Sequence, residues 1–174
     1  MRSTKLFMLV VSVLIAASPL LNSACSSEAP PPKTANVQPG EMPPGGAWSG
    51  VYYNAIFGYL HLIADGDTFE GRWLRADESR WGEMTGKITG DVARFDWVEH
   101  TIGLVGPSSK RTGKGYFRYN RPEGDNVDDR LLGEWGFDDA EIGGGEWDSI
   151  KQRNRVPDLK SVGGSSDATV GSWK

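Results

Sequence analysis

The chain has 174 residues, with 23 glycines, ten prolines, seven tryptophans, one cysteine and a formal net charge of −4. This length allows one domain, or a small domain with tails, and so much glycine excludes a long-helix bundle because each interior glycine costs a helix about 1 kcal/mol. One cysteine excludes a disulfide framework and a cysteine zinc cluster, and the acidic balance argues against nucleic acid as a partner.

The start of the chain has the pattern of an export signal. Arg2 and Lys5 form a short basic end, and the run from Leu6 to Leu21 is almost wholly apolar. At about 1.5 Å per residue, this run is too short to span a bilayer comfortably, and it is typical of the core of a secretory signal. We interpret residues 1–24 as a signal peptide.

The only cysteine, Cys25, stands directly after Asn22, Ser23 and Ala24. These residues resemble the lipobox of bacterial lipoproteins, in which the cysteine becomes the lipidated first residue of the exported protein. Lipoproteins usually have an aliphatic residue where Asn22 stands, so cleavage after Ala24 without lipidation is the alternative. The resemblance implies a palmitate-type lipid at Cys25 that holds the protein in the cell envelope. Ser26 is compatible with sorting to the outer membrane.

Two polar segments flank the middle of the chain. Residues 25–45 hold most of the prolines and no aromatic residue, which predicts a disordered tether behind the lipidated cysteine. Residues 156–174 are polar and rich in glycine and serine, which predicts a flexible tail. The folded domain is therefore expected within residues 46–155.

Residues 46–155 show the two-residue alternation of half-buried strands and no helical stripe. For example, Ala93, Phe95 and Trp97 alternate with charged residues, and turn residues such as 89–91 (Thr-Gly-Asp) separate the alternating stretches. The eight predicted strands are Trp48–Asn54, Gly58–Ala64, Thr68–Arg75, Gly82–Thr89, Val92–His100, Gly113–Asn120, Leu131–Phe137 and Gly145–Gln152.

A repeated Gly-x-Trp unit sharpens this prediction. Residues two apart in a strand lie on the same face, so each unit puts bare backbone beside a large ring. Alternating small and large inward residues fill the curved interior of a small closed barrel, and eight strands enclose just enough space for side chains or one small ligand. The units begin at Gly46, Gly71, Gly133 and Gly145, with a near copy at Gly115.

The opening Gly46-Ala47-Trp48 unit and the eight-strand meander resemble the calycin superfamily of lipocalins, avidins and fatty-acid-binding proteins. The resemblance implies an all-β fold: an eight-stranded antiparallel up-and-down meander closed into a small barrel, with Gly46 and Trp48 as its structural opening motif. Lipocalins stack a basic residue from the chain end on this indole, and the resemblance suggests Arg153 or Arg155 for that role. The Thr-Asp-Tyr motif of lipocalins does not occur, so the resemblance predicts architecture and not a ligand.

Aromatic residues of the predicted strands are the candidate ligand-binding residues. Facing inward together, they either fill the core or line an apolar pocket with a few polar groups. Tyr59, His61 or Ser149 would supply those polar groups, depending on register. Tryptophan and tyrosine on an outer face would instead stack on sugars. The candidate set is Trp73, Phe95, Trp97, Phe117, Tyr119, Trp135 and Trp147.

Residue spacing gives no metal or phosphate signature. His61 and His100 lack a histidine or cysteine companion at metal-ligand spacing, and the acidic clusters at 125–129 and 138–141 lack the spacing of an EF-hand. Residues 106–115 depart from the Walker pattern and precede a predicted strand, so their basic side chains are at most a contact for an anionic partner. We predict no metal and no cofactor.

Catalytic signatures are also absent from the sequence. No Gly-x-Ser-x-Gly elbow occurs, and the sole cysteine belongs to the signal. Asp96 and Glu99 lie near Arg94, which we interpret as an ion-pair ladder on a strand surface rather than an acid–base pair. The sequence therefore predicts a protein that is not an enzyme.

Together these patterns predict a non-catalytic envelope lipoprotein whose barrel binds a small apolar ligand or an envelope protein partner. One alternative is a structural or accessory subunit of an envelope machine for secretion, motility or surface assembly. A secreted enzyme inhibitor or a small enzyme is less favoured. A hollow barrel would favour a ligand carrier, and an interior filled by indoles would favour contacts made by the loops.

Overall fold

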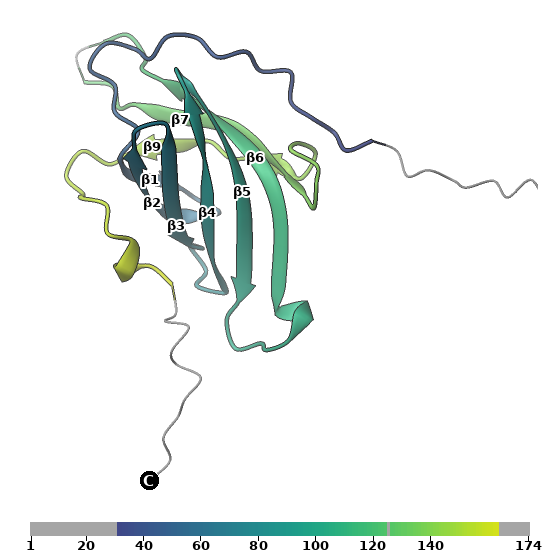
Figure 1. The fold of residues 1–174 in the computed structure, drawn as a ribbon. Helices are drawn as coiled ribbons and strands as arrows, with labels where there is room; N and C mark the ends of the chain where they lie inside the picture. The colour runs from purple at the N-terminus through teal and green to yellow at the C-terminus, as the bar shows by residue number, and fades with distance from the viewer. Residues whose placement is uncertain (1–30, 125, 164–174) are drawn as a thin grey trace, which may run out of the picture. The chain divides into compact units, whose positions relative to one another are not determined.

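A computed structural model describes residues 31–124 and 126–163 of the chain. Within them the chain forms β-strands and two single-turn 3-10 helices (Figure 1). The predicted signal peptide, Cys25 and the end of the predicted tail lie outside the described residues. The strands are β1 (Gly50–Asn54), β2 (Gly58–Asp65), β3 (Thr68–Leu74), β4 (Arg80–Thr89), β5 (Val92–Thr101), β6 (Lys110–Asn120), β7 (Arg130–Phe137), β8 (Gly145–Glu146) and β9 (Ser149–Lys151), with turns η1 (Pro107–Ser109) and η2 (Leu159–Ser161).

The strands close into a barrel. Each of β1 to β7 pairs antiparallel with the next strand in the chain, and β9 pairs with both β7 and β1. β8 and β9 pair with β7 in one register, and between them the Trp147 N–H donates to the Gly133 carbonyl at 2.8 Å. They are therefore two pieces of the predicted last strand, Gly145–Gln152. The predicted all-β, eight-stranded up-and-down barrel is confirmed.

Inward glycines explain how large rings fit inside so small a barrel. Gly82 lies directly opposite Trp73, and an added Cβ would stand 2.1 Å from the indole Cζ2. Gly113 lies opposite Trp97, and its Cβ would stand 2.6 Å from that indole. Each indole thus lies over the glycine that faces it on the neighbouring strand. The same contact recurs between Gly86 and Phe69, Gly115 and Phe95, and Gly133 and Phe117.

The opening motif helps to close one end of the barrel, which we call the closed end. Trp48 is 6 % exposed, its Nε1 donates to the Gly90 carbonyl at 3.3 Å, and its ring meets that of Tyr119 edge-on at 5.4 Å. The Gly46 N–H donates to the Pro43 carbonyl at 2.9 Å. The motif therefore joins the start of the barrel to the turn at Gly90 and to β6.

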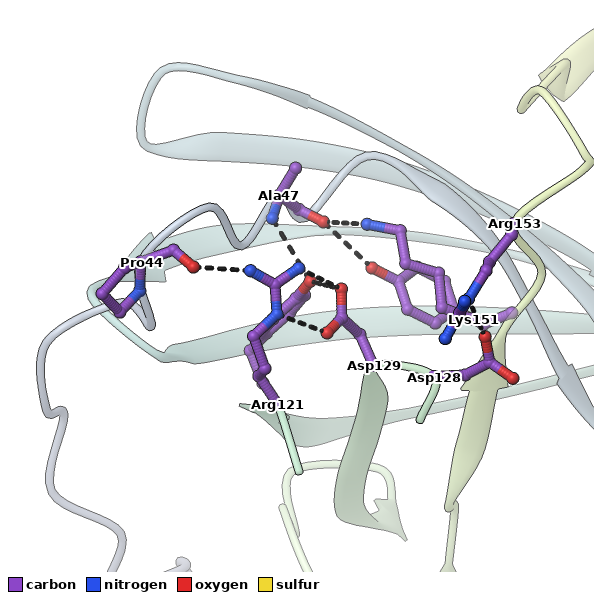
Figure 2. Close-up of polar contacts among 9 residues, drawn as sticks. Pro44, Ala47, Arg121, Asp128, Asp129, Lys151 and Arg153 are labelled. Carbon is purple, nitrogen blue, oxygen red and sulfur yellow. Dashed lines mark hydrogen bonds and ion pairs between the residues drawn. The ribbon is translucent and has the colours of Figure 1, made fainter. Parts of the chain in front are cut away.

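An ion pair ties the incoming chain to the closed end (Figure 2). The Arg121 guanidinium donates to both carboxylate oxygens of Asp129, at 2.8 and 3.0 Å, and to the Pro44 carbonyl at 2.5 Å. The Tyr119 hydroxyl donates to the same carboxylate. Burial raises the pKa of Tyr119 to about 12, so its hydroxyl remains a donor at neutral pH.

Lys151 is the basic residue that lies beside the opening motif. Its Nζ donates to the Ala47 carbonyl and lies 5.5 and 5.6 Å from the ring centroids of Tyr52 and Tyr119. The suggested arginines lie elsewhere, since Arg153 pairs with Asp128 at 2.5 Å and Arg155 covers another tyrosine. Lys151 reaches these groups because β9 places it directly opposite Tyr52 on β1.

Residues 31–45, here called the N-terminal segment, lie along the outside of the barrel (Figure 1). Composition predicts disorder for this stretch, yet polar contacts hold its backbone. The Glu141 carboxylate accepts from the Ala35 N–H at 2.8 Å and pairs with Arg94, whose guanidinium donates to the Val37 carbonyl at 3.1 Å. Further along, Arg118 donates to Gln38, Asp91 accepts from Gly40, and Arg121 donates to Pro44.

The first part of the predicted tail is also packed against the barrel. Residues 155–163, here called the C-terminal strap, include the η2 turn and a Val162 side chain that is 6 % exposed. The Asp158 N–H donates to Nδ1 of His61 on β2 at 3.0 Å. Both segments thus extend the folded structure beyond residues 46–155.

Candidate functional site

The end of the barrel opposite the closed end, which we call the mouth, is built from four connections. They are residues 55–57, 75–79, 102–109 and 138–144. Backbone hydrogen bonds link the first three in sequence: the Ala76 N–H donates to Ile56 at 3.4 Å, and the Ile102 N–H donates to Ser79 at 3.0 Å. The mouth is therefore a connected rim rather than a set of independent loops.

Four of the seven candidate aromatic residues meet just below this rim. The rings of Trp73 and Trp147 cross at 75° with centroids 5.0 Å apart, and those of Trp97 and Trp135 cross at 81° and 5.6 Å. Such edge-to-face pairs are the favoured arrangement of buried aromatic rings. The other three candidates do not line the mouth. Phe95 and Phe117 pack deeper against Trp147, and Tyr119 belongs to the closed end.

These indoles nearly fill the interior. The cavity that they enclose offers about 20 Å³ to the centre of a water molecule, which suits one or two waters. The Nε1–H groups of Trp73, Trp135 and Trp147 are buried and find no acceptor among the described residues. An unpaired buried donor costs about 1–3 kcal/mol. The cavity wall therefore combines indoles that have unpaired donors with the charged side chains of Arg75, Glu99 and Arg111.

Phe57, which the sequence analysis did not single out, is the lid of this cavity. Its ring stacks on Trp147 at 4.1 Å, and the Arg75 guanidinium lies 5.1 Å from its centroid. The Asn54 side chain holds the turn by accepting from the Phe57 N–H at 3.0 Å. Gly58 has a φ of +69°, and a Cβ there would stand 2.2 Å from the Leu74 carbonyl. The Asn54-to-Gly58 spacing is the sequence signal that could have located this turn.

Glu99 lies inside the mouth and corrects the prediction of a surface ladder. Its side chain is 4 % exposed and accepts from Arg75 at 2.6 Å and from Arg80 at 3.4 Å. Asp96 is 75 % exposed and pairs with Lys114 on the outer face at 3.6 Å. The two carboxylates differ because successive side chains of a strand point to opposite faces. Glu99 shares the inward face of β5 with Phe95 and Trp97, whereas Asp96 points outward.

The rim itself exposes large apolar side chains. Val105 is 84 % exposed, and Gly103 and Gly106, with φ of +81° and +97°, turn the chain on either side of it. An open groove of about 540 Å³ runs along the rim and shares Phe57 and Trp135 with the inner cavity. The other exposed apolar side chains of the rim are Ile56, Ile102, Leu104 and Phe137.

The remaining sequence candidates have ordinary structural surroundings. His100 stacks on Trp81 at 4.2 Å, and His61 lies on the outer face of β2. Within residues 31–124 and 126–163, no three metal-ligating side chains converge. In the loop of residues 106–115, β6 begins at Lys110, as expected of a loop that is not a Walker motif.

No family model, curated protein or solved structure matches this chain. The barrel is consistent with the calycin architecture that the opening motif suggested. In the part of the chain that is described, no helix is long and apolar enough to cross a bilayer. The case for function therefore depends on the geometry of the barrel.

Proposed function

We propose that the protein is a non-catalytic lipoprotein of the bacterial cell envelope whose barrel binds a partner protein at the mouth. The observation that carries this proposal is the contrast between a filled interior and an apolar rim. About 20 Å³ of internal space is too little for a carried ligand, while the rim leaves Val105 84 % exposed. Apolar side chains gathered at one end of a soluble barrel mark an interaction surface.

The rim has the features of a contact surface that is prepared before binding. Hydrogen bonds between neighbouring connections hold Ile56 and Ile102 in place, so binding does not have to order separate loops. The groove of about 540 Å³ offers a recess beside Ile56. A partner segment with apolar side chains would bury Leu104 and Val105 on contact.

A small ligand at the mouth is the second candidate, and the unpaired indoles favour it. The buried Nε1–H groups of Trp73, Trp135 and Trp147 would each donate a hydrogen bond to an oxygen or nitrogen atom of the ligand. Such a ligand would lie in the groove and reach the cavity past Phe57. Its acceptor atoms would relieve donors that otherwise stay unpaired.

The lack of catalysis is supported by how the buried carboxylates are used. Glu99 is engaged by two arginines, and Glu141 by Arg94 and a backbone N–H. Asp91 pairs with Arg118 at 2.7 Å. Carboxylates held in this way are committed to the fold and are poor acid–base pairs for a substrate.

A matched pair of valines tests the partner-binding surface. Val105 and Val156 are 84 % and 85 % exposed, but only Val105 belongs to the rim. We expect Val105→Asp to weaken capture of crosslinked envelope partners about tenfold or more, because a charge would be buried at the contact. Val156→Asp should leave the same partners bound. Equal capture by both variants, or equal loss, would contradict binding at the mouth.

A further inference from the structure

A row of aromatic side chains crosses the outer face of the sheet, beside the mouth. The register of β1 to β5 places Tyr53 opposite Tyr59, Tyr59 opposite Leu74, Leu74 opposite Trp81, and Trp81 opposite His100. Residues directly opposite in an antiparallel sheet share a face. The rings of Tyr53 and Tyr59 are 4.9 Å apart, and those of Trp81 and His100 stack at 4.2 Å. Leu74 separates the two pairs.

The C-terminal strap covers this row. The Arg155 guanidinium lies 4.0 Å from the centroid of Tyr59, and the backbone at Gly163 rests on Trp81, where an added Cβ would stand 2.6 Å from the indole. The strap does not fill the space below it. A groove of about 470 Å³ remains between strap and sheet, within the size range of small-molecule sites.

The groove combines an aromatic floor with polar groups that have no other partner. Arg155 and Glu78 both line it, and neither side chain has an ion pair or hydrogen bond within the described residues. His61 accepts the Asp158 N–H on Nδ1, so the neutral imidazole carries its hydrogen on Nε2 and can donate it. The groove therefore offers two donors and one carboxylate acceptor above the rings of Tyr53 and Tyr59.

This mixture selects among ligand classes. A purely apolar ligand would remove Arg155 and Glu78 from water without replacing their hydrogen bonds, which is costly. A simple anion would suit Arg155 but would face the Glu78 carboxylate. A sugar ring satisfies both, because each hydroxyl donates and accepts while the C–H face of the ring packs on tyrosine.

We propose that the groove between the C-terminal strap and the outer face of β1–β3 is a carbohydrate-binding site. Tyr53 supplies the stacking surface, and Tyr59 holds Arg155 in place over its ring. Arg155 and His61 donate to ring hydroxyls, and Glu78 accepts from one. The strap is part of the site because it carries Arg155. The site lies beside the mouth and shares the 75–79 connection with it, but it does not depend on the partner proposed there.

Titration of the full exported chain with defined sugars, followed by NMR, tests the site. The probes are cellotriose and triacetylchitotriose, which are neutral, and trigalacturonic acid, which is acidic. We expect saturable shifts at Tyr53, Tyr59 and His61 with at least one probe. Tyr59→Ala and Arg155→Ala should each weaken binding about tenfold. The matched control is Arg153→Ala, because Arg153 is exposed and pairs with Asp128 outside the groove.

The Glu78→Gln variant provides a second test of the site, which stands even if the tyrosine variant does not fold. Glu78 is exposed on the β3–β4 turn, so this change should weaken sugar binding several-fold and leave the melting temperature unchanged. A response to trigalacturonic acid alone would assign the site to acidic sugars. No saturable shift with any probe at millimolar concentration would overturn the proposal, as would binding that is insensitive to Tyr59→Ala and Arg155→Ala.

Discussion

The surroundings of a single residue in this barrel depend on which face of its strand the side chain occupies. Glu99 shares the inward face of β5 with Trp97, and its carboxylate is held by Arg75 and Arg80 where water is largely excluded. Asp96, three positions earlier on the same strand, is 75 % exposed. The two acidic residues therefore provide a comparison of a buried and a surface ion pair within one strand.

Glu99→Gln should destabilise the protein by about 3 kcal/mol, because it leaves two arginines beside an uncharged buried group. Asp96→Asn should change the free energy of unfolding by less than about 1 kcal/mol, since exposed pairs contribute little. Urea unfolding followed by tryptophan fluorescence measures both. Similar losses in the two variants would mean that the Glu99 pairs are not effectively buried.

At the scale of elements, the strands were predictable and the flanking segments were not. Alternation marks strands because a half-buried sheet needs it, and the predicted segments correspond to β1–β7 and to β8 with β9. Composition alone misses the N-terminal segment, because arginines far along the chain hold its backbone and only scattered apolar side chains, such as Ala35 and Met42, pack on the barrel. Arg94 and Ala35 are an example of such a contact.

The candidate site was predictable in part for the same reason. The alternation of side chains along the strands identifies Trp73, Trp97, Trp135 and Trp147 as inward-facing. It does not say at which end of the barrel each ring lies. Alternation could not identify Phe57, because this residue lies in a turn, where side chains no longer alternate between two faces. Its place over Trp147 depends on the turn geometry set by Gly58.

The C-terminal strap should be released as the solution becomes acidic. Burial lowers the pKa of His61 below its ordinary value of 6.5, with Arg72 opposite it on β3 and with Arg155 and Asp158 on the strap. Above pH 6.5 the imidazole is neutral whether or not the strap is docked. Below that value protonation of Nδ1 removes the acceptor of the Asp158 N–H, so docking weakens as the pH falls.

Hydrogen exchange measures this release. The protection factor of the Asp158 amide should be constant from about pH 8 to 6.5 and should fall at lower pH, while that of Trp147 in the barrel ladder stays constant. The His61→Gln variant should lose this dependence. A protection factor at Asp158 that does not change with pH would show that the imidazole bond does not hold the strap.

At the scale of the whole molecule, side chains nearly fill the interior of the barrel, so we expect its function to lie on the surface. The interior holds the fold together, and the mouth and the strap groove lie next to each other on the exterior, where Arg75 lines both grooves. An anchored protein of this kind would meet its partners on one side of a bilayer. Attachment through Cys25 is therefore the prediction that decides where the surface acts.

Labelling with a palmitate analogue tests the anchor. The wild-type chain should incorporate the label and sediment with membranes, and Cys25→Ser should do neither. Ser23→Ala, which keeps a small residue before the cysteine, is the control and should be labelled normally. Equal labelling of Cys25→Ser and the wild type would refute lipidation at this residue.

The docking of the N-terminal segment shortens the free length of chain between an anchor at Cys25 and the barrel. Of the residues between Cys25 and the barrel, those from Lys33 onward are held against its wall, and the Lys33 carbonyl accepts from the Glu141 N–H at 2.8 Å. About eight residues would then separate a lipid at Cys25 from the first fixed point, and they would span about 25 Å in polyproline form. The anchored barrel would therefore work close to the bilayer surface, and its partners would have to be found there.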